Sequence, residues 1–416
     1  MPKLVLSDIN KKYRGGVQAI KDFSLEINDH EFVVILGKSG CGKTTLLRLI
    51  SGLDHPDFGE IYFDDELIND VDPLDRQTAM VFQNYALYPQ MNVYQNLSIP
   101  LKIKLVKKQV FDKNNKPLLS PNYERIEELK LQIKECKDKQ NKKDLKKEIK
   151  DIKSNPTEPT FSFVHYTKEE IDKKIKTVAN ELGITPFLYQ SASTLSGGQK
   201  QRVALGKAMI REPKILLMDE PLSNIDAKSR SQALMLIQKV HNKCRATTIY
   251  VTHDQNECIT LADKLVIMDD GVIEQVGDPL DVIHNPNSIK VATFMGNPPT
   301  NIIEVTSESK NIKIESIDGE IILPIDCKFD NASLYIGVRP EKISICPIEN
   351  SIKVPVVCDY QELLGHDLYC YAFIKDQRIA IKLPKKVKLN PEEKFDIYID
   401  KKSLLFFNKE TGRRIY

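Results

Sequence analysis

The feature that most constrains this chain is a glycine-rich segment, GKSGCGKT, at residues 37–44. It fits the pattern G-x-x-x-x-G-K-[ST] throughout and lies between an apolar run, FVVIL, and a stretch with apolar residues at helical spacing, TTLLRLISGL. Such a segment binds phosphate only where a buried strand turns into a helix, because the loop backbone and the helix N-terminus must both face the anion. The sequence therefore predicts an α/β domain that holds a nucleotide by its phosphates.

The side chains of this segment have different expected tasks. Its glycines let backbone N–H groups turn inward onto the phosphates, Lys43 supplies a positive charge for the β- and γ-oxygens, and the Thr44 hydroxyl suits a Mg²⁺ ion. Cys41 fills a variable position and is expected to contribute only its backbone. The residues predicted to contact the nucleotide here are Gly37, Lys38, Ser39, Gly40, Cys41, Gly42, Lys43, Thr44 and Thr45.

A second apolar run, KILLMDEP at 214–221, ends in two adjacent carboxylates. A buried strand of this kind delivers Asp219 to the shell of a metal ion, while Glu220 beside it is placed to orient and deprotonate an attacking water. Adjacent carboxylates after an apolar strand are common, so this run gains weight only beside the phosphate loop. Together the two runs predict a phosphate site at which water attacks.

Three further residues are candidates for the same site, and each has an ordinary alternative. Gln83, in VFQNYALYP, can reach Mg²⁺ or water through its amide, although a lone glutamine after a strand is usually a loop residue. His253, in VTHD, is the one histidine of seven that ends an apolar strand, where an imidazole can contact the γ-phosphate. Tyr13, in NKKYRGG, suits stacking on adenine but also an ordinary loop position.

A second glycine-rich segment, TLSGGQKQR at 194–202, raises the question of why one chain needs two. It precedes a helix-like segment and has the composition of another phosphate-binding helix N-terminus. A phosphate loop leaves part of a triphosphate uncovered. A second helix end would therefore have to close over the γ-phosphate from elsewhere.

Length and composition exclude several classes of protein. With 416 residues the chain predicts two or three domains. A formal charge of +2 gives no reason to expect nucleic acid as a partner. The eight cysteines have no CxxC or Cys/His ligand spacing, which is typical of reduced cytosolic thiols. The N-terminus lacks a signal-peptide core and no 18 apolar residues run together, so we expect a soluble chain that reaches a membrane only through a partner.

Short runs of β-branched and aromatic residues, separated by helix-length segments, give most of the first 300 residues an α/β rhythm. The runs predicted as strands are LVLSDI, FSLEI, FVVIL, EIYFD, AMVFQ, KILLMDEP, TTIYVTHD and KLVIMDDGVI. Helical patterning is predicted for 167–212, and residues 285–301 predict a helix followed by a proline-rich linker. Beyond a boundary near Asn297, short alternating strands predict a small β-barrel or sandwich.

Residues 105–165 interrupt this rhythm. The stretch 101–153 contains 17 Lys/Arg against 9 Asp/Glu. Apolar residues recur at helical spacing over 126–136, a set that includes Cys136, and again over 145–152, but the phase breaks across KDKQNKKD. This pattern favours two short amphipathic helices folded as a hairpin over one continuous coiled coil, although the simpler interpretation is a solvated charged excursion.

Taken in order, these motifs resemble the ATP-binding cassette subunits of membrane transporters. The resemblance covers residues 1 to about 104 and 167 to about 300, and LSGGQ is its most specific element. It implies an α/β ATPase core that uses ATP and Mg²⁺, carries a helical subdomain and works as a nucleotide-sandwich dimer. The matching segments are the phosphate loop at 37–44, the glutamine loop at Gln83, LSGGQ at 195–199, the acidic strand end at Asp219 and Glu220, SNID at 223–226, and the switch histidine His253.

The resemblance also answers the question of the second glycine-rich segment. In the family, this segment of one subunit closes over the ATP held by the phosphate loop of the other, and the aspartate of SNID, here Asp226, helps to align the two. The residues implied for this contact are Leu195, Ser196, Gly197, Gly198 and Gln199. The implied metal shell is Thr44, Gln83 and Asp219, and the implied catalytic residues are Glu220, His253 and Gln83.

The C-terminal region narrows the resemblance to importers of carbohydrates. FMGNPPTN and GVRPEK resemble the regulatory domain of ATPases that drive maltose, multiple-sugar or glycerol-3-phosphate import, and VFQNYALYPQMNVYQNL and LDRQTAMVFQ agree with this. The polyamine importer ATPase, for spermidine or putrescine, shares the same architecture. The implied domains are an α/β ATP-binding cassette at 1–296, with a helical subdomain at about 84–212 and a lysine-rich insertion at about 105–165, and an all-β, OB/TOBE-like domain at 297–416.

The partners implied are a second copy of the same or a related ATPase subunit, two transmembrane permease subunits and, indirectly, an extracellular solute-binding protein, with no nucleic acid. They would place the chain at the cytoplasmic face of the membrane. Two departures stand out: Ile225 replaces the usual leucine of SNID, and the insertion inherits no function from the family. A soluble cassette ATPase acting on ribosomes or DNA is the alternative from another class, but such proteins commonly carry two cassettes.

Overall fold

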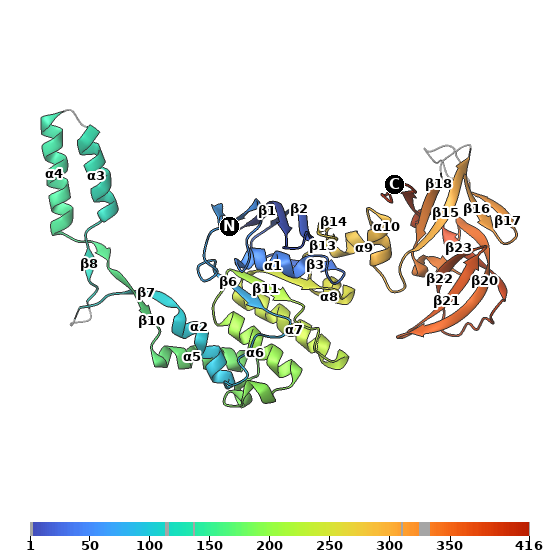
Figure 1. Cartoon of the computed structure of the whole chain (residues 1–416), viewed down its shortest axis with the longest axis horizontal. Coiled ribbons are helices and arrows are strands. Elements are labelled where there is room, and N and C mark those ends of the chain that lie inside the picture. Colours follow the sequence, from blue (N-terminus) through green and yellow to red (C-terminus); the bar gives the residue numbers. More distant parts are fainter. Residues whose placement is uncertain (1–2, 113–115, 136–137, 309–310, 324–332, 416) are drawn as a thin grey trace. The chain divides into compact units, whose positions relative to one another are not determined.

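The structure is a computed structural model of the chain (Figure 1). It describes residues 3–112, 116–135, 138–308, 311–323 and 333–415. The chain divides into two compact units. The first comprises Met1–Tyr85 together with Pro213–Tyr416, and the second comprises Ala86–Glu212.

A six-stranded sheet forms the centre of the first unit, in the order β14-β13-β3-β12-β11-β6 (Figure 1). Its strands are β3 (Phe32–Gly37), β6 (Thr78–Val81), β11 (Ile215–Asp219), β12 (Thr247–Thr252), β13 (Lys264–Asp269) and β14 (Val272–Gly277). All neighbours are parallel except β13 and β14. Strands β3, β11 and β12 are buried along their whole length, because a parallel sheet is covered on both faces, and this explains the apolar runs of β3 and β11 and the β-branched residues of β12. Their carboxyl ends meet at one edge.

Helix α1 (Lys43–Ser51) follows β3 and shares one hydrophobic core with the central sheet and with a second, antiparallel sheet. The second sheet has the order β2-β1-β4-β5. Its strands are β1 (Leu4–Lys12), β2 (Gln18–Ile27), β4 (Phe58–Phe63) and β5 (Glu66–Leu67). The apolar side chains of α1 are almost fully buried, as its helical spacing predicts. The predicted strand–loop–helix opening is confirmed.

Four more α-helices lie in the described part of the first unit. They are α7 (Ala227–Cys244), α8 (Gln255–Leu261), α9 (Pro279–His284) and α10 (Ile289–Phe294).

The prediction of a single strand run over KLVIMDDGVI is wrong in one respect. Asp270 and Gly271 both have positive φ, 46° and 82°, and turn the chain so that β13 and β14 pair as antiparallel neighbours.

The helices of the second unit confirm the helical patterning of 167–212. Within 167–212 these are α5 (Lys168–Glu181) and α6 (Gly197–Met209), with 3₁₀ turns at Thr185–Phe187 and Ala192–Thr194, and the same unit also contains α2 (Val93–Ile103). Helix α2 was not predicted, because it carries an internal Pro100 and lies in an aromatic, β-branched stretch. A reciprocal capping box between Asn92 and Gln95 fixes its start instead.

Between α2 and α5 the chain forms an arm, residues 105–165 (Figure 1). Strand β7 (Leu105–Gln109) pairs with β10 (Phe161–His165), and β8 (Leu119–Ser120) pairs with β9 (Glu158–Pro159). Helices α3 (Tyr123–Glu135) and α4 (Lys139–Ser154) lie against each other. The predicted two-helix hairpin is confirmed, whereas the strands that carry it were not predicted. Cys136, part of the predicted spacing, lies outside the described residues.

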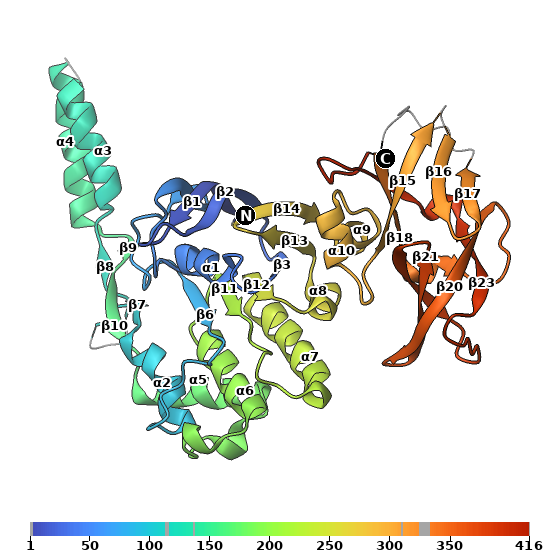
Figure 2. The same ribbon diagram turned by 45° about the vertical axis from the view of Figure 1, so that its right-hand side comes forward.

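The described C-terminal residues form two five-stranded antiparallel sheets (Figure 2), as predicted for this region. The first, ordered β17-β16-β15-β18-β24, consists of β15 (Asn301–Glu308), β16 (Asn311–Ser316), β17 (Gly319–Leu323), β18 (Ser333–Val338) and β24 (Leu405–Asn408). The second, ordered β19-β23-β20-β21-β22, consists of β19 (Ile343–Ser344), β20 (Ser351–Leu364), β21 (Asp367–Ile374), β22 (Gln377–Leu383) and β23 (Lys394–Asp400). Alternate residues of both sheets form one core.

Arg76 ties the end of α1 to the turn that precedes β6. Its side chain is almost fully buried and donates to the carbonyls of Leu49, Ile50, Asn69 and Val71 at 2.7–3.1 Å. Two of these carbonyls belong to the last turn of α1, where C=O groups have no partner within the helix. A single guanidinium therefore satisfies both the helix end and the turn.

We expect Arg76→Met to lower the free energy of unfolding by about 2–4 kcal/mol, because it leaves several buried carbonyls without a donor. Arg48→Met, at an exposed position of the same helix, is the matched control and should change it by less than about 0.5 kcal/mol. Urea denaturation followed by circular dichroism measures both values. Equal stabilities of the two variants would contradict this account of Arg76.

Candidate functional site

The phosphate loop lies between β3 and α1, and its backbone requires glycine. Gly40 and Gly42 have φ values of 85° and 105°, a backbone conformation that residues with a side chain rarely adopt. A Cβ on Gly42 would also lie 2.3 Å from the carbonyl oxygen of Ala19. Lys38, Ser39 and Gly40 are exposed at the tip of the loop. The loop therefore presents backbone at the N-terminus of α1, as phosphate binding requires.

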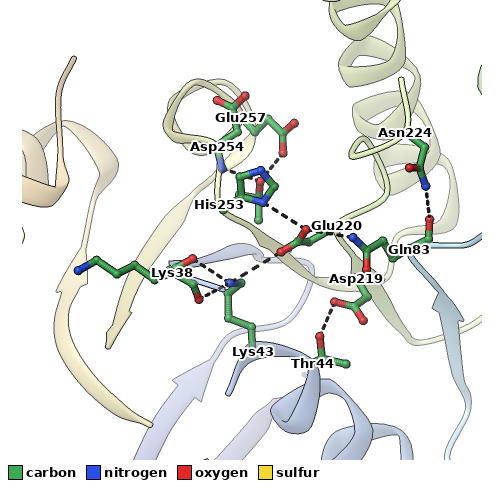
Figure 3. A network of polar contacts seen from close by, with 12 residues as sticks. Lys38, Lys43, Thr44, Gln83, Asp219, Glu220, Asn224, His253, Asp254 and Glu257 are labelled. Carbon is green, nitrogen blue, oxygen red and sulfur yellow. Dashed lines mark hydrogen bonds and ion pairs between the residues drawn. The ribbon is translucent and has the colours of Figure 1, made fainter. Parts of the chain in front are cut away.

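Lys43 and Cys41 lie on the inner side of this loop. The Lys43 side chain is buried, and its ammonium donates to the carbonyls of Gly37 at 2.8 Å and Lys38 at 3.0 Å (Figure 3). It also lies 3.8 Å from Oε1 of Glu220. Burial raises the pKa of the Cys41 thiol, which packs beneath the loop. The Lys43 ammonium thus places one positive charge inside the loop, where a phosphate oxygen could replace one of these carbonyls as its hydrogen-bond acceptor.

Thr44 and Asp219 meet although they are 175 positions apart in the sequence. Thr44 stands in the first turn of α1 and Asp219 ends β11, and the Thr44 hydroxyl donates to Oδ1 of Asp219 at 3.0 Å (Figure 3). Burial raises the pKa of the Asp219 carboxyl, and the hydrogen bond from Thr44 opposes that shift. A hydroxyl and a carboxylate side by side are the hard oxygen ligands that suit Mg²⁺.

Glu220 lies where three strand ends come together (Figure 3). Nδ1 of His253, which follows β12, lies 3.2 Å from Oε2 of Glu220, and the Gln83 amide, beyond β6, donates to the same oxygen at 3.4 Å. Glu220 has a φ of 42°, a left-handed conformation that is strained for a residue with a side chain. The structure thus brings the three predicted catalytic residues together around one carboxylate. Such an arrangement suits a general base.

A buried network supports the loop that carries His253. Glu257, in α8, accepts hydrogen bonds from the hydroxyls of Tyr250 at 2.8 Å and Thr252 at 2.6 Å. Both donors belong to β12, so the carboxylate anchors the first turn of α8 to the end of that strand. Burial raises the pKa of Glu257, and these two hydrogen bonds oppose the shift.

Sequence reasoning missed Glu257, Asn224 and Arg230. Asn224 Nδ2 donates to the backbone carbonyl of Gln83 at 3.1 Å, and Arg230 of α7 pairs with Asp254 at 2.5 Å. Asn224 lies inside the SNID motif and Glu257 follows VTHD within one helical turn, so both were detectable. Arg230 has no local signal, because its role depends on α7 lying beside α8.

Tyr13 lies beside the first turn of α1. Its hydroxyl is 3.3 Å from Oγ1 of Thr45 and donates to Asp54 at 3.2 Å, and the Lys11 ammonium lies 5.7 Å from the ring centroid. The side chain keeps an exposed fraction of 37%. The predicted adenine contact would therefore be made by a ring held next to the phosphate loop.

The second glycine-rich segment begins α6 in the second unit. Ser196 is the N-cap and forms a capping box with Gln199: the Ser196 N–H donates to Oε1 of Gln199 at 2.9 Å, and the Gln199 N–H donates to Oγ of Ser196 at 3.4 Å. Leu195 is buried, whereas a Cβ on Gly198 would meet nothing within 4 Å. Gly197, the first residue of α6, stands between them. Packing within the unit therefore does not require glycine at position 198.

Asp226 belongs to the first unit and caps α7. Its carboxylate accepts a hydrogen bond from the Ser229 N–H at 2.9 Å, and this bond lowers the pKa of the Asp226 carboxyl. The neighbouring Ile225, which departs from the usual leucine, is buried. The SNID segment therefore combines an apolar anchor with an ionised cap.

Comparison with known proteins identifies similar chains along the whole length. Residues 20–223 match the ABC transporter family. The chain is 35% identical to the sn-glycerol-3-phosphate import ATP-binding protein of Cupriavidus metallidurans, with 100% of this chain and 99% of that protein covered. It is also 35% identical to the multiple sugar-binding transport ATP-binding protein of Streptococcus mutans, with 100% of both covered.

Among solved structures, the chain is similar to a dimeric ATP-binding cassette in a post-hydrolysis state bound to ADP and Pi. The sequence identity is 25% and the TM-score is 0.48, with 66% of this chain and 98% of that chain covered.

The variant Glu257→Gln tests how ionisation of the Glu257 carboxyl affects stability, because glutamine does not ionise. Because its pKa is raised on folding, the folded chain binds the proton more tightly, and ionisation above the unfolded value of about 4.5 costs stability. Glutamine avoids that cost. In urea denaturation the stability of the unmodified chain relative to the variant should therefore be greatest below the unfolded value of about 4.5 and fall as the pH rises through the higher pKa of the folded chain. A relative stability that rises with pH would contradict this.

Proposed function

The chain belongs to the ATP-binding proteins of the ABC transporter family, and we propose that it is the ATPase of an importer for a sugar or glycerol-3-phosphate. The observation that carries this proposal is the similarity over the full length, which includes the C-terminal β-region as well as the cassette. The names of these relatives favour this class over a polyamine importer. They also favour it over a soluble cassette ATPase that acts on ribosomes or DNA.

The proposed ATP site is the edge where the phosphate loop, β11 and β12 end. The loop backbone and Lys43 would hold the β- and γ-phosphates, and the ring of Tyr13 would contact the adenine. The oxygens of Thr44 and Asp219, with the amide oxygen of Gln83, would hold Mg²⁺. When bound, this ion neutralises the negative charge of the phosphates.

Glu220 is the proposed general base. Its carboxylate would accept a proton from the water that attacks the γ-phosphate. His253 and Gln83 both contact Oε2, which fixes the orientation of the carboxylate, while Lys43 lies nearer Oε1. In this arrangement, a contact between His253 and the γ-phosphate would also affect the position of Glu220, because His253 lies against that carboxylate.

The second glycine-rich segment is the proposed lid for the ATP of another chain. Ser196, Gly198 and the N-terminus of α6 would close over a nucleotide held by Lys43 of a second copy, and Asp226 would align the two chains. The exposed backbone around Gly198 supports this role, since no contact within its own unit requires glycine there. One chain would then contribute halves of two composite sites.

The proposed complex contains two ATPase subunits, two transmembrane permease subunits and, on the other side of the membrane, a solute-binding protein. Among the described residues, no helix is both long and apolar enough to cross a bilayer. We propose that the chain works at the cytoplasmic face through its permeases. The proposed domains are the cassette at 1–296, with its helical subdomain at 84–212, and a regulatory β-domain at 297–416.

We expect Glu220→Gln to lower ATP turnover by about 10²–10⁴-fold, because it removes the base but keeps the shape of the side chain. The variant should still bind ATP and should elute as an ATP-dependent dimer in size-exclusion chromatography. Glu60→Gln, a loss of one carboxylate in the second sheet of the first unit, is the matched control and should keep normal turnover. Unchanged hydrolysis by Glu220→Gln would remove Glu220 from the role of base.

Ser196→Arg tests the composite site. We expect it to abolish ATP hydrolysis while equilibrium binding of a fluorescent ATP analogue to the phosphate loop stays unchanged, because the lid acts on another chain's nucleotide. Mixing this variant with Glu220→Gln should restore part of the turnover, since one of the two composite sites is then intact in the mixed dimer. A Ser196→Arg chain that hydrolyses ATP normally would argue against a shared site.

A further inference from the structure

The charges of α4, in the arm, are segregated by sign. Its sequence, KQNKKDLKKEIKDIKS, contains seven lysines and three acidic residues. At about 3.6 residues per turn, five of the six lysines whose side chains the structure describes fall within an arc of about 120°, the acidic residues fall within a separate arc, and the half-buried apolar residues occupy a third. The five residues, which we call the lysine stripe, are Lys143, Lys146, Lys147, Lys150 and Lys153. The stripe runs for about 15 Å along the helix.

Within the described residues the ammonium groups of the lysine stripe have no partners, in contrast to Arg125 and Lys130 of α3. Arg125 of α3 pairs with Glu128 at 3.0 Å and with Glu148 of α4 at 3.1 Å, and Lys130 pairs with Glu127. All five stripe lysines are exposed, and within the described part of the chain none of their ammonium groups has an ion pair or hydrogen bond. Like charges three and four residues apart on a helix repel one another. An anionic surface would attract all five lysines and so offset the repulsion between them.

The ribbon that carries the hairpin adds an exposed apolar face. Phe163 pairs with Lys107 and Phe161 with Gln109, so the two phenylalanines lie on one face of the β7–β10 ribbon together with Leu105. Their exposed fractions are 70%, 45% and 52% for Phe163, Phe161 and Leu105. The Lys107 ammonium lies 4.6 Å from the Phe161 ring centroid. Exposed aromatic side chains with adjacent lysines are typical of a surface that contacts lipid head groups.

We propose that the arm binds an anionic lipid surface, with the lysine stripe on the head groups and the apolar face of the ribbon at the boundary with the acyl chains. The choice of lipid among polyanions rests on the proposed importer function, which keeps the chain beside a bilayer. It rests also on the phenylalanines, which gain free energy by leaving water. Lysines near an anionic surface each strengthen binding about fivefold, so five of them can hold an arm to it.

The test uses the full chain and sedimentation with vesicles, either of phosphatidylcholine alone or with one quarter phosphatidylglycerol. We expect binding to the mixed vesicles only, with loss at high salt. The triple variant Lys143→Gln, Lys147→Gln, Lys150→Gln should lower the partition coefficient on the order of a hundredfold. The matched control, with an equal loss of charge at exposed positions of the C-terminal region, is Lys385→Gln, Lys386→Gln, Lys388→Gln, which should bind like the unmodified chain.

A second pair of variants tests the apolar face. Phe163→Ser should weaken vesicle binding about tenfold, whereas Phe58→Ser, at an equally exposed phenylalanine of β4, should not. Equal binding by the two triple variants, or tighter binding of DNA or RNA than of mixed vesicles at the same salt, would overturn the proposal. ATP hydrolysis without vesicles, measured on the same preparations, should be unchanged in all these variants. Failure of lipid binding with normal hydrolysis would therefore refute only the role of the arm.

Discussion

A parallel sheet buried on both faces aligns the carboxyl ends of its strands, and the site depends on this alignment. Asp219 of β11 is paired with Val251 of β12, so Glu220 lies beside the end of β12 and within reach of His253. The Glu220 N–H even donates to the Val251 carbonyl at 3.1 Å. A slip of one residue in this register would move each of the two carboxylates to the other face of the sheet. The apolar sequence of the strands thus fixes the chemistry at their ends.

Those parts of the site that are encoded locally could be predicted from the sequence. The phosphate loop and the acidic strand end each combine an apolar strand with residues at its carboxyl end, and the parallel sheet makes their meeting necessary. Arg230 and Arg76 could not be predicted in this way, because each serves backbone or side chains far away in the sequence. Helix α2 was hidden by Pro100, although its capping box at Asn92 was present in the sequence.

The two glycine-rich segments use glycine for different physical reasons. In the phosphate loop, Gly42 is forced by its φ and by the carbonyl of Ala19, so its own fold requires it. At the start of α6, Gly198 has neither a positive φ nor a close neighbour, and the cap depends on Ser196 and Gln199 alone. A glycine that the fold does not need is easier to explain by the close approach of something outside the unit, which agrees with the proposed lid.

The arm shows why the net charge of a chain is a weak guide to its partners. The formal charge of +2 gave no reason to expect an anionic partner, yet it is a sum in which acidic and basic regions cancel. On α4 the acidic residues lie in their own arc and Glu148 pairs with Arg125 across the hairpin, so the lysine stripe keeps its full charge on one face. Attraction to a surface falls off within a Debye length, about 10 Å at 0.1 M salt, and therefore depends on that face and not on the total. The distribution of charge on one helix, and not the composition of the chain, is what an anionic surface would meet.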